Sequence, residues 1–347
     1  MKIERLAELL KDQGIDHALI CDPNVILYYT GYRFSPGERL LALLVNQDGS
    51  HKFFLNKLFN YAGTITAEWF YDADNGMALI ARELNGTVAI DKNMAAHFLL
   101  DLFELRPDLK LIKGTVIDEV KAVKTPAELA KMITASKRND EVMAKVKTLI
   151  KPGISERALR DLIDAELLKF GPLSFDTIVL FGDHAADPHG QPGERLLKAN
   201  EAVVVDMGVR VADYCSDMTR TFFVGANGEK EIYDTVLKAN LAGIKAVKPG
   251  VPFKEVDLAA RKVITEAGYG DYFIHRLGHG IGVDEHEPFD VSATDEVVIK
   301  EGMCFSIEPG IYIPGRVGIR IEDLVYVDRD GAVLLNHYPK DEEVIDQ

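Results

Sequence analysis

The chain has 347 residues, of which 47% are hydrophobic and 27% are charged, and its formal net charge is −15. This composition is ordinary for a folded protein with room for two domains, and it argues against an intrinsically disordered chain. No basic stripe offsets the negative charge and no apolar run approaches about 18 residues, so neither nucleic acid nor a membrane is an expected partner.

The first residues predict an amphipathic helix that ends near Gly14, because apolar and charged residues alternate there at helical spacing. A signal peptide is therefore not expected at the start of the chain. The cysteines lie far apart in apolar settings, which is typical of reduced thiols in a cytoplasmic protein. They are three in number: Cys21, Cys215 and Cys304.

Strand and helix patterns alternate over residues 1–120 and predict an α/β domain. After the first helix, strands are expected at 17–21, 40–45, 51–55, 87–91 and 109–112, and helices near 24–29 and 96–105. The strands at 40–45 and 51–55 flank a turn at 46–49.

A second domain is expected over residues 121–347, with the boundary in about Asp118 to Lys124. A helix should begin at Pro126, because Thr125 can cap it and Glu128 completes a capping box. No Gly/Ser-rich linker marks the junction, so we expect the two domains to pack against each other.

The second domain contains a weak internal repeat. Lys151-Pro152-Gly153 opens a helical pattern that stops at Gly171, and 97 positions later Lys248-Pro249-Gly250 opens one that stops at Gly268. His189 and His286 are related by the same offset. The repeat predicts two halves that face each other across a pseudo-twofold axis. The alternative is that a common turn-to-helix opener occurs twice by coincidence.

Four acids and one histidine in apolar strand-like runs predict a site for two divalent cations: Asp206, Asp217, His279, Glu308 and Glu322. An ionised carboxylate in a buried strand is penalised unless it is paired or binds a metal. Two carboxylates about 4 Å apart also repel by roughly 4 kcal/mol at an effective dielectric of about 20. The spacings suit two antiparallel hairpins, with turns near Gly208 and Asp213 and near Pro314 and Gly315. The alternative is a set of ordinary ion-pair acids.

With these motifs the chain resembles the M24 metallopeptidase family, and its first domain resembles the creatinase-type domain of prolidase and aminopeptidase P. The resemblance implies an α+β pita-bread catalytic domain. It further implies that Asp206 chelates one metal ion, that His279 and Glu308 bind the other, and that Asp217 and Glu322 bridge both. Oxygen ligands with one imidazole suit Mn²⁺, our preference, and also Co²⁺ or Zn²⁺.

The resemblance also implies roles in catalysis. A hydroxide bridging the metal ions would attack the peptide carbonyl, and Glu308 would act as general acid and base. His189 and His286 would hold the peptide and stabilise the oxyanion, although a histidine can equally be a packed or solvated residue. No such support exists for His184, His275 or His337, but His275 lies close enough in sequence to line the cleft.

Substrate choice depends on the residues around these ligands. Arg276 is a candidate clamp for the free carboxylate of a dipeptide, with a surface ion pair as the alternative. Arg320 can brace Glu322 or contact substrate. The polar segment Arg33–Arg39 is predicted to be a solvated loop. In relatives this domain helps to form a homodimer, so the alternative is that Glu38 or Arg39 borders the partner's active site.

The resemblance predicts a cytoplasmic Xaa-Pro dipeptidase that acts on proline-containing dipeptides. The first alternative is an Xaa-Pro aminopeptidase that acts on longer peptides. A remote alternative is a non-catalytic binding module on the same fold.

Overall fold

The computed structural model describes residues 2–226 and 228–345. The chain divides into two compact units, Met1–Lys121 and Ala122–Gln347. The segment in which a boundary was expected is helical, because α5 spans Thr115–Ala122. In the described part of the chain, no helix combines the length and the apolar composition needed to cross a membrane. All three cysteines are free thiols.

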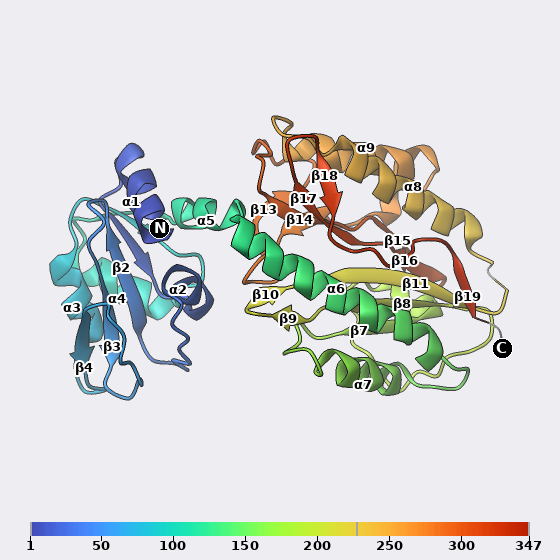
Figure 1. Ribbon diagram of the computed structural model, residues 1–347, viewed down its shortest axis with the longest axis horizontal. Coiled ribbons are helices and arrows are strands. Elements are labelled where there is room, and N and C mark those ends of the chain that lie inside the picture. Colours follow the sequence, from blue (N-terminus) through green and yellow to red (C-terminus); the bar gives the residue numbers. More distant parts are fainter. Residues whose placement is uncertain (1, 227, 346–347) are drawn as a thin grey trace. The chain divides into compact units, whose positions relative to one another are not determined.

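The first unit is a mixed six-stranded sheet with helices, so the predicted α/β architecture is confirmed (Figure 1). The sheet order is β4-β3-β2-β1-β5-β6, and β1 pairs antiparallel with β2 and parallel with β5. The strands are β1 His17–Ile20, β2 Leu41–Asn46, β3 His51–Asn56, β4 Ala67–Phe70, β5 Thr87–Ile90 and β6 Lys110–Lys113. The helices before α5 are α1 Lys2–Asp12, α2 Pro23–Thr30, α3 Gly76–Glu83 and α4 Ala96–Leu105. The sequence patterns missed β4 and α3, which are only four and eight residues long.

The segment Arg33–Arg39 is a loop, as expected. Phe34 anchors it by packing against Phe53 with ring centroids 5.5 Å apart. Arg39 donates two hydrogen bonds to Asp72, at 3.0 and 3.2 Å. Arg39 is therefore held within its own unit, and a role for this loop at a partner's site stays a prediction.

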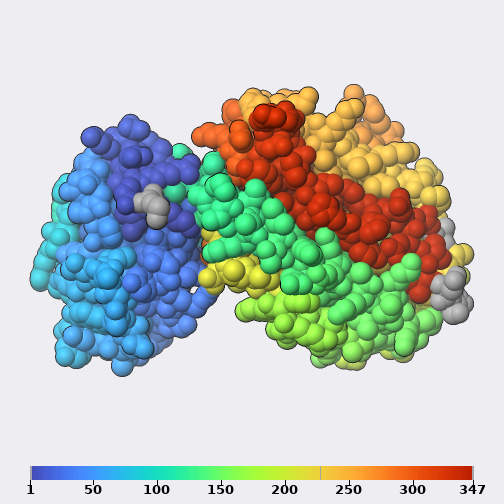
Figure 2. All heavy atoms as spheres, viewed as in Figure 1, coloured from blue at the N-terminus to red at the C-terminus, as the bar shows by residue number. Residues whose placement is uncertain are grey.

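The second unit begins with the long helix α6, Pro126–Leu149, and the predicted capping box is confirmed. Glu128 N donates to Thr125 Oγ1, and Thr125 N donates back to the Glu128 carboxylate at 2.8 Å. Asp140 of α6 accepts hydrogen bonds from the backbone N–H groups of His337 and Tyr338, which lie near the C-terminal end of the chain. Figure 2 shows the C-terminal segment, in red, running along this helix, in green.

Two helix pairs cover two sheets in this unit (Figure 1). Helices α6 and α7 (Glu156–Leu167) share a core with the sheet ordered β19-β11-β8-β7. Helices α8 (Lys230–Ala246) and α9 (Phe253–Glu266) share a core with the sheet ordered β13-β12-β14-β17-β18. The strands of the first sheet are β7 Ile178–Phe181, β8 Glu201–Met207, β11 Met218–Val224 and β19 Glu343–Ile345. Those of the second are β12 Gly278–Gly280, β13 Glu287–Val291, β14 Cys304–Ile307, β17 Asp323–Val327 and β18 Ala332–Leu334.

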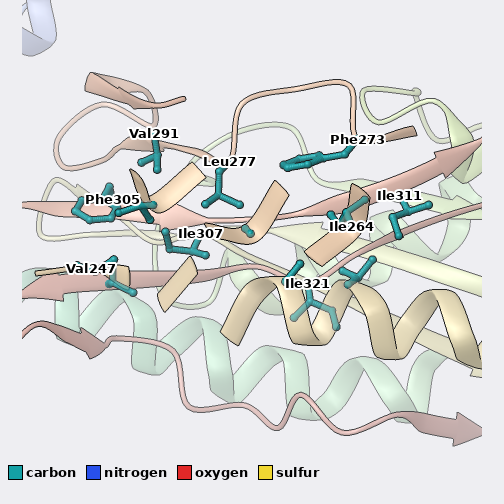
Figure 3. Packing of buried hydrophobic residues seen from close by; sticks show 14 of the residues in the cluster. Val247, Ile264, Phe273, Leu277, Val291, Phe305, Ile307, Ile311 and Ile321 are labelled. Carbon is teal, nitrogen blue, oxygen red and sulfur yellow. The ribbon is translucent and has the colours of Figure 1, made fainter. Parts of the chain in front are cut away.

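The two halves are equivalent, which confirms the internal repeat and the pita-bread architecture. In each half a long antiparallel pair, β8 with β11 or β14 with β17, encloses a small two-stranded ribbon. The ribbons are β9 Arg210–Val211 with β10 Tyr214–Cys215, and β15 Gly310–Ile313 with β16 Val317–Arg320. Figure 3 shows the second half's core, where Phe305 and Ile307 of β14 lie among apolar residues such as Leu277 and Val291.

The turns of the two small ribbons lie where they were predicted, except that Gly208 is not part of one. Asp213, with φ 73°, and Gly315, with φ 70°, lie in the turns of the two ribbons as predicted. Gly208 lies outside the turn, between β8 and β9, and permits a close approach of the paired chain, because a Cβ there would lie 2.1 Å from Ser216 O. The glycines that flank His279 also permit close approach of neighbouring strands, since Cβ atoms there would meet Ser306 O and Pro288 O.

Candidate metal centre

All five predicted ligands lie in one cleft of the second unit, which has a volume of about 200 Å³. Asp206 lies on β8 and His279 on β12. Asp217 immediately precedes β11, Glu308 immediately follows β14 and Glu322 immediately precedes β17. The cleft is lined by Phe175, Ile178, Pro188, His189, Asp206, Asp217, His275, Arg276, His279, Glu285, His286, Glu308, Arg320 and Glu322. The ends of two equivalent strand pairs therefore converge on one site.

The candidate ligand atoms are close enough to share cations. One ligand atom each from Asp217, His279 and Glu322 lies within 4.8 Å of the others. His279 Nε2 lies 3.8 Å from Asp217 Oδ2 and 3.4 Å from Glu308 Oε1.

Three of the acids keep a buried oxygen without a hydrogen-bond partner: Asp206 Oδ1, Asp217 Oδ1 and Glu322 Oε1. The second oxygens of two of these acids are partnered, because Asp206 Oδ2 accepts from Arg320 Nη2 at 2.6 Å and Glu322 Oε2 accepts from Thr219 Oγ1 at 2.7 Å. Leaving a buried acceptor unsatisfied costs about 1–3 kcal/mol, and more for a charged group. A divalent cation satisfies such oxygens, so the residues present fit the metal site that the sequence predicts.

The electrostatics of the acids also fit cation binding. Desolvation, followed by repulsion from Glu322, raises the pKa of Asp217 well above its usual range. Desolvation, followed by repulsion from Glu308, does the same to the pKa of Glu322. The pKa of Glu308 is raised to about 7, chiefly by desolvation. Without cations the cleft therefore retains protons near neutral pH, and divalent ions would displace them.

His279 is oriented as a neutral ligand. Its Nδ1 lies 3.1 Å from Gly280 O and donates to it, which leaves a lone pair on Nε2 facing Glu308 and Asp217. Desolvation, together with the nearby His286, lowers the pKa of His279 to about 3, so the ring is neutral. A neutral imidazole whose second nitrogen is fixed by a backbone carbonyl is the usual form of a metal-binding histidine.

Arg320 braces Asp206, so the expected contact with Glu322 is wrong in its detail. The Arg320 guanidinium is buried, and its Nη2 donates to Asp206 Oδ2 at 2.6 Å. It reaches Glu322 only through Thr219, to whose hydroxyl Arg320 Nε donates at 3.0 Å. Tyr312 OH accepts from Arg320 Nη1 at 3.0 Å. Arg320 also lines the cleft, so contact with substrate stays a prediction.

Replacing Arg320 with lysine is expected to weaken Mn²⁺ binding by roughly 10–100-fold. Lysine keeps the charge, but a single ammonium cannot contact Asp206, Thr219 and Tyr312 at once. Calorimetric titration of metal-free protein measures the effect. Arg316→Lys is the matched control, because Arg316 is exposed and pairs with Glu229. Equal affinities of both variants and the unchanged protein would contradict the bracing role.

The other histidines separate into two groups. His189 and His286 are exposed and line the cleft, and the His286 ring lies 4.1 Å from that of His279 in an edge-to-face arrangement. His275 lines the cleft as well, with Nε2 2.9 Å from Tyr312 OH. His184 instead pairs with the buried Glu156 at 2.9 Å. The catalytic roles of His189 and His286 stay predictions.

Arg276 lines the cleft, but it also forms an ion pair with Asp290. Its side chain is 34% exposed. A substrate carboxylate would therefore compete with Asp290 or share the guanidinium with it. The ion pair considered as the alternative is present, and the carboxylate clamp stays a prediction.

The sequence reasoning missed several side chains that support the ligands. Ser306 accepts a hydrogen bond from His279 N and donates to Glu308 Oε1 at 3.2 Å, while Thr219 supports Glu322. A signal for both existed, because residues two apart on a strand share a face. Ser306 and Glu308 form such a pair, as do Asp217 and Thr219. Tyr312 gave no comparable signal.

The fold and the acid-lined cleft together define a metallopeptidase of the pita-bread type. Residues 130–329 match metallopeptidase family M24, and residues 2–123 match the creatinase/prolidase N-terminal domain. The chain belongs to the M24 family, as the resemblance predicted.

Relatives along the full chain agree with this assignment. A curated protein called an uncharacterized peptidase, from Staphylococcus aureus, is 40% identical over 98% of this chain and 99% of its own length. The dipeptidase structure from Pyrococcus horikoshii is 35% identical, with a TM-score of 0.93 over 99% of this chain and 100% of that one. The prolidase structure from Thermococcus sibiricus is 30% identical, with a TM-score of 0.91 over 99% of this chain and 98% of that one.

Proposed function

We propose that the chain is an Xaa-Pro dipeptidase that uses two divalent metal ions, preferably Mn²⁺. The observation that carries the proposal is the set of three buried carboxylate oxygens without partners beside a neutral histidine. Asp206 would chelate one ion, His279 and Glu308 the other, and Asp217 and Glu322 would bridge both. Bound there, the ions would lower the pKa of water and polarise the scissile carbonyl.

The protein's own groups would handle the proton and the developing charge. Glu308 would move a proton from the attacking water to the leaving amine, for which a pKa near neutrality is suited. His189 and His286 would donate hydrogen bonds to the oxyanion from the exposed rim of the cleft. A cytoplasmic location and a homodimer remain predictions.

A comparison of Leu-Pro with Leu-Pro-Pro, with Mn²⁺, Co²⁺ and Zn²⁺ in parallel, tests the proposal. We expect the dipeptide to be cleaved faster, with Mn²⁺ giving the highest rate. Comparable or faster cleavage of the tripeptide would favour an Xaa-Pro aminopeptidase. The ion pair of Arg276 with Asp290 is the observation that supports this alternative, because it occupies the predicted carboxylate clamp.

Replacing Arg276 with alanine tests the clamp itself. We expect KM for Leu-Pro to rise by about tenfold or more, which corresponds to the loss of one hydrogen bond between charged groups. KM for Leu-Pro-amide, which lacks the free carboxylate, should change little. An equal rise for both substrates would show that Arg276 does not recognise the carboxylate.

A further inference from the structure

Glu285 is a carboxylate in the cleft that the proposed chemistry does not use. It lies beside His286, and its side chain is 34% exposed. Its Oε1 lies 3.6 Å from His286 Nε2, while the His286 side chain is itself 54% exposed. Glu285 therefore reaches the space that a substrate would occupy.

Glu285 has no strong counter-ion within the described residues. The nearby cation Arg210 donates to Val283 O at 2.8 Å. Among residues 2–226 and 228–345, Arg210 forms no ion pair with Glu285 within 4.0 Å. Glu285 is only partly exposed, so its ionised form has lost part of its hydration. A cation bound within the cleft would compensate for that loss.

The same cleft offers apolar surface from Phe175 and Ile178. Lysine and arginine combine an apolar stem with a charged head, and they bury the stem on apolar surface while the head reaches a polar partner. Apolar walls and a carboxylate within one cleft are complementary to such a side chain.

We propose that Glu285 gives the site a preference for substrates whose first residue has a cationic side chain, lysine or arginine. This inference rests on the proposed Xaa-Pro dipeptidase function. Because proline carries no side-chain charge, a cation bound by Glu285 belongs to the first residue. It can be the side chain or the α-ammonium group, and the experiment separates the two.

Arg-Pro and citrulline-Pro provide the test, since they are similar in shape and differ in side-chain charge. We expect kcat/KM to favour Arg-Pro by about tenfold, which corresponds to one hydrogen bond between charged groups. In Glu285→Gln this ratio should fall to near one. Comparing ratios cancels any disturbance of the adjacent His286. Glu296→Gln is the matched control, because Glu296 is exposed and pairs with Lys254, and it should leave the ratio unchanged.

Two outcomes would overturn the assignment. One is a ratio near one in the unchanged protein or a ratio that survives Glu285→Gln. The other is an equal loss for both dipeptides in Glu285→Gln, which would assign the carboxylate to the α-ammonium group.

Binding of free amino acids separates this inference from the proposed function. L-arginine should bind the Mn²⁺-loaded protein more tightly than L-citrulline, and Glu285→Gln should remove the difference. Neither ligand has a peptide bond, so calorimetry gives a result even if no dipeptide is cleaved. Equal affinities in the unchanged protein would refute the role of Glu285, whereas failure of dipeptide cleavage alone would refute only the dipeptidase proposal.

Discussion

Replacement of Asp217 with asparagine is expected to abolish peptidase activity, lowering kcat/KM by at least about a thousandfold, or ~4 kcal/mol of transition-state stabilisation. Asp217 Oδ1 is buried without a partner, and the other oxygen lies 3.8 Å from His279 Nε2. An amide keeps the size of the side chain but removes the charge and one oxygen. Because Asp217 is proposed to bridge both ions, its replacement should weaken the binding of both.

Stability measurements distinguish this result from misfolding. The pKa of Asp217 is raised in the folded chain, so its ionised form destabilises the metal-free protein, and stability is lost as pH rises through the folded pKa. At neutral pH, metal-free Asp217→Asn should therefore melt at the same temperature as the unchanged protein or higher. Mn²⁺ should raise the Tm of the unchanged protein much more than that of the variant.

A matched control lies close by in the chain. Asp213→Asn changes the same residue type in the turn between β9 and β10, where φ is 73° and asparagine is tolerated. It should leave activity and metal content unchanged. An active Asp217→Asn variant that retains two metal ions would refute the assignment of Asp217 as a bridging ligand.

The sequence predicted which acids and which histidine meet in one cleft, because strand geometry places these side chains. Acids at the ends of apolar runs project from paired strands, and the repeat places two such pairs opposite each other. The same period-2 reasoning extends to Ser306, which supports Glu308 two residues further on. That contact follows from local backbone geometry, so it can be read from sequence, whereas the support of Glu322 by Thr219 joins residues of the two halves.

Contacts between distant segments could not be read in this way. Arg276 precedes β12 and meets Asp290 of the paired strand β13, and Arg320 meets Asp206 across the two halves of the unit. Tyr312 and His275 contact each other from separate segments for the same reason. Such partners depend on the crossing of strands in three dimensions, which residue spacing does not specify.

Replacement of Lys124 with methionine is expected to lower the stability of the second unit by about 3–5 kcal/mol. Lys124 Nζ lies 2.5 Å from Glu287 Oε2, and the two side chains are 2% and 1% exposed. Glu287 Oε1 also accepts from the backbone N–H groups of Val283 and Asp284. Methionine fills a similar volume but removes the Lys124 ammonium group from the buried Glu287 carboxylate. In thermal unfolding followed by circular dichroism, the second unit should melt roughly 10 °C lower.

The double variant Lys124→Met with Glu287→Gln shows whether the loss of stability comes from the charge of the Glu287 carboxylate. Glutamine keeps an oxygen for the two backbone N–H groups and removes the charge, so the double variant should recover most of the lost stability. The pair also supports the loop that carries Glu285 and His286, so Lys124→Met alone should reduce kcat/KM even when the protein is folded. A Lys124→Met variant with unchanged Tm, or a double variant less stable than either single one, would show that this ion pair does not hold the loop.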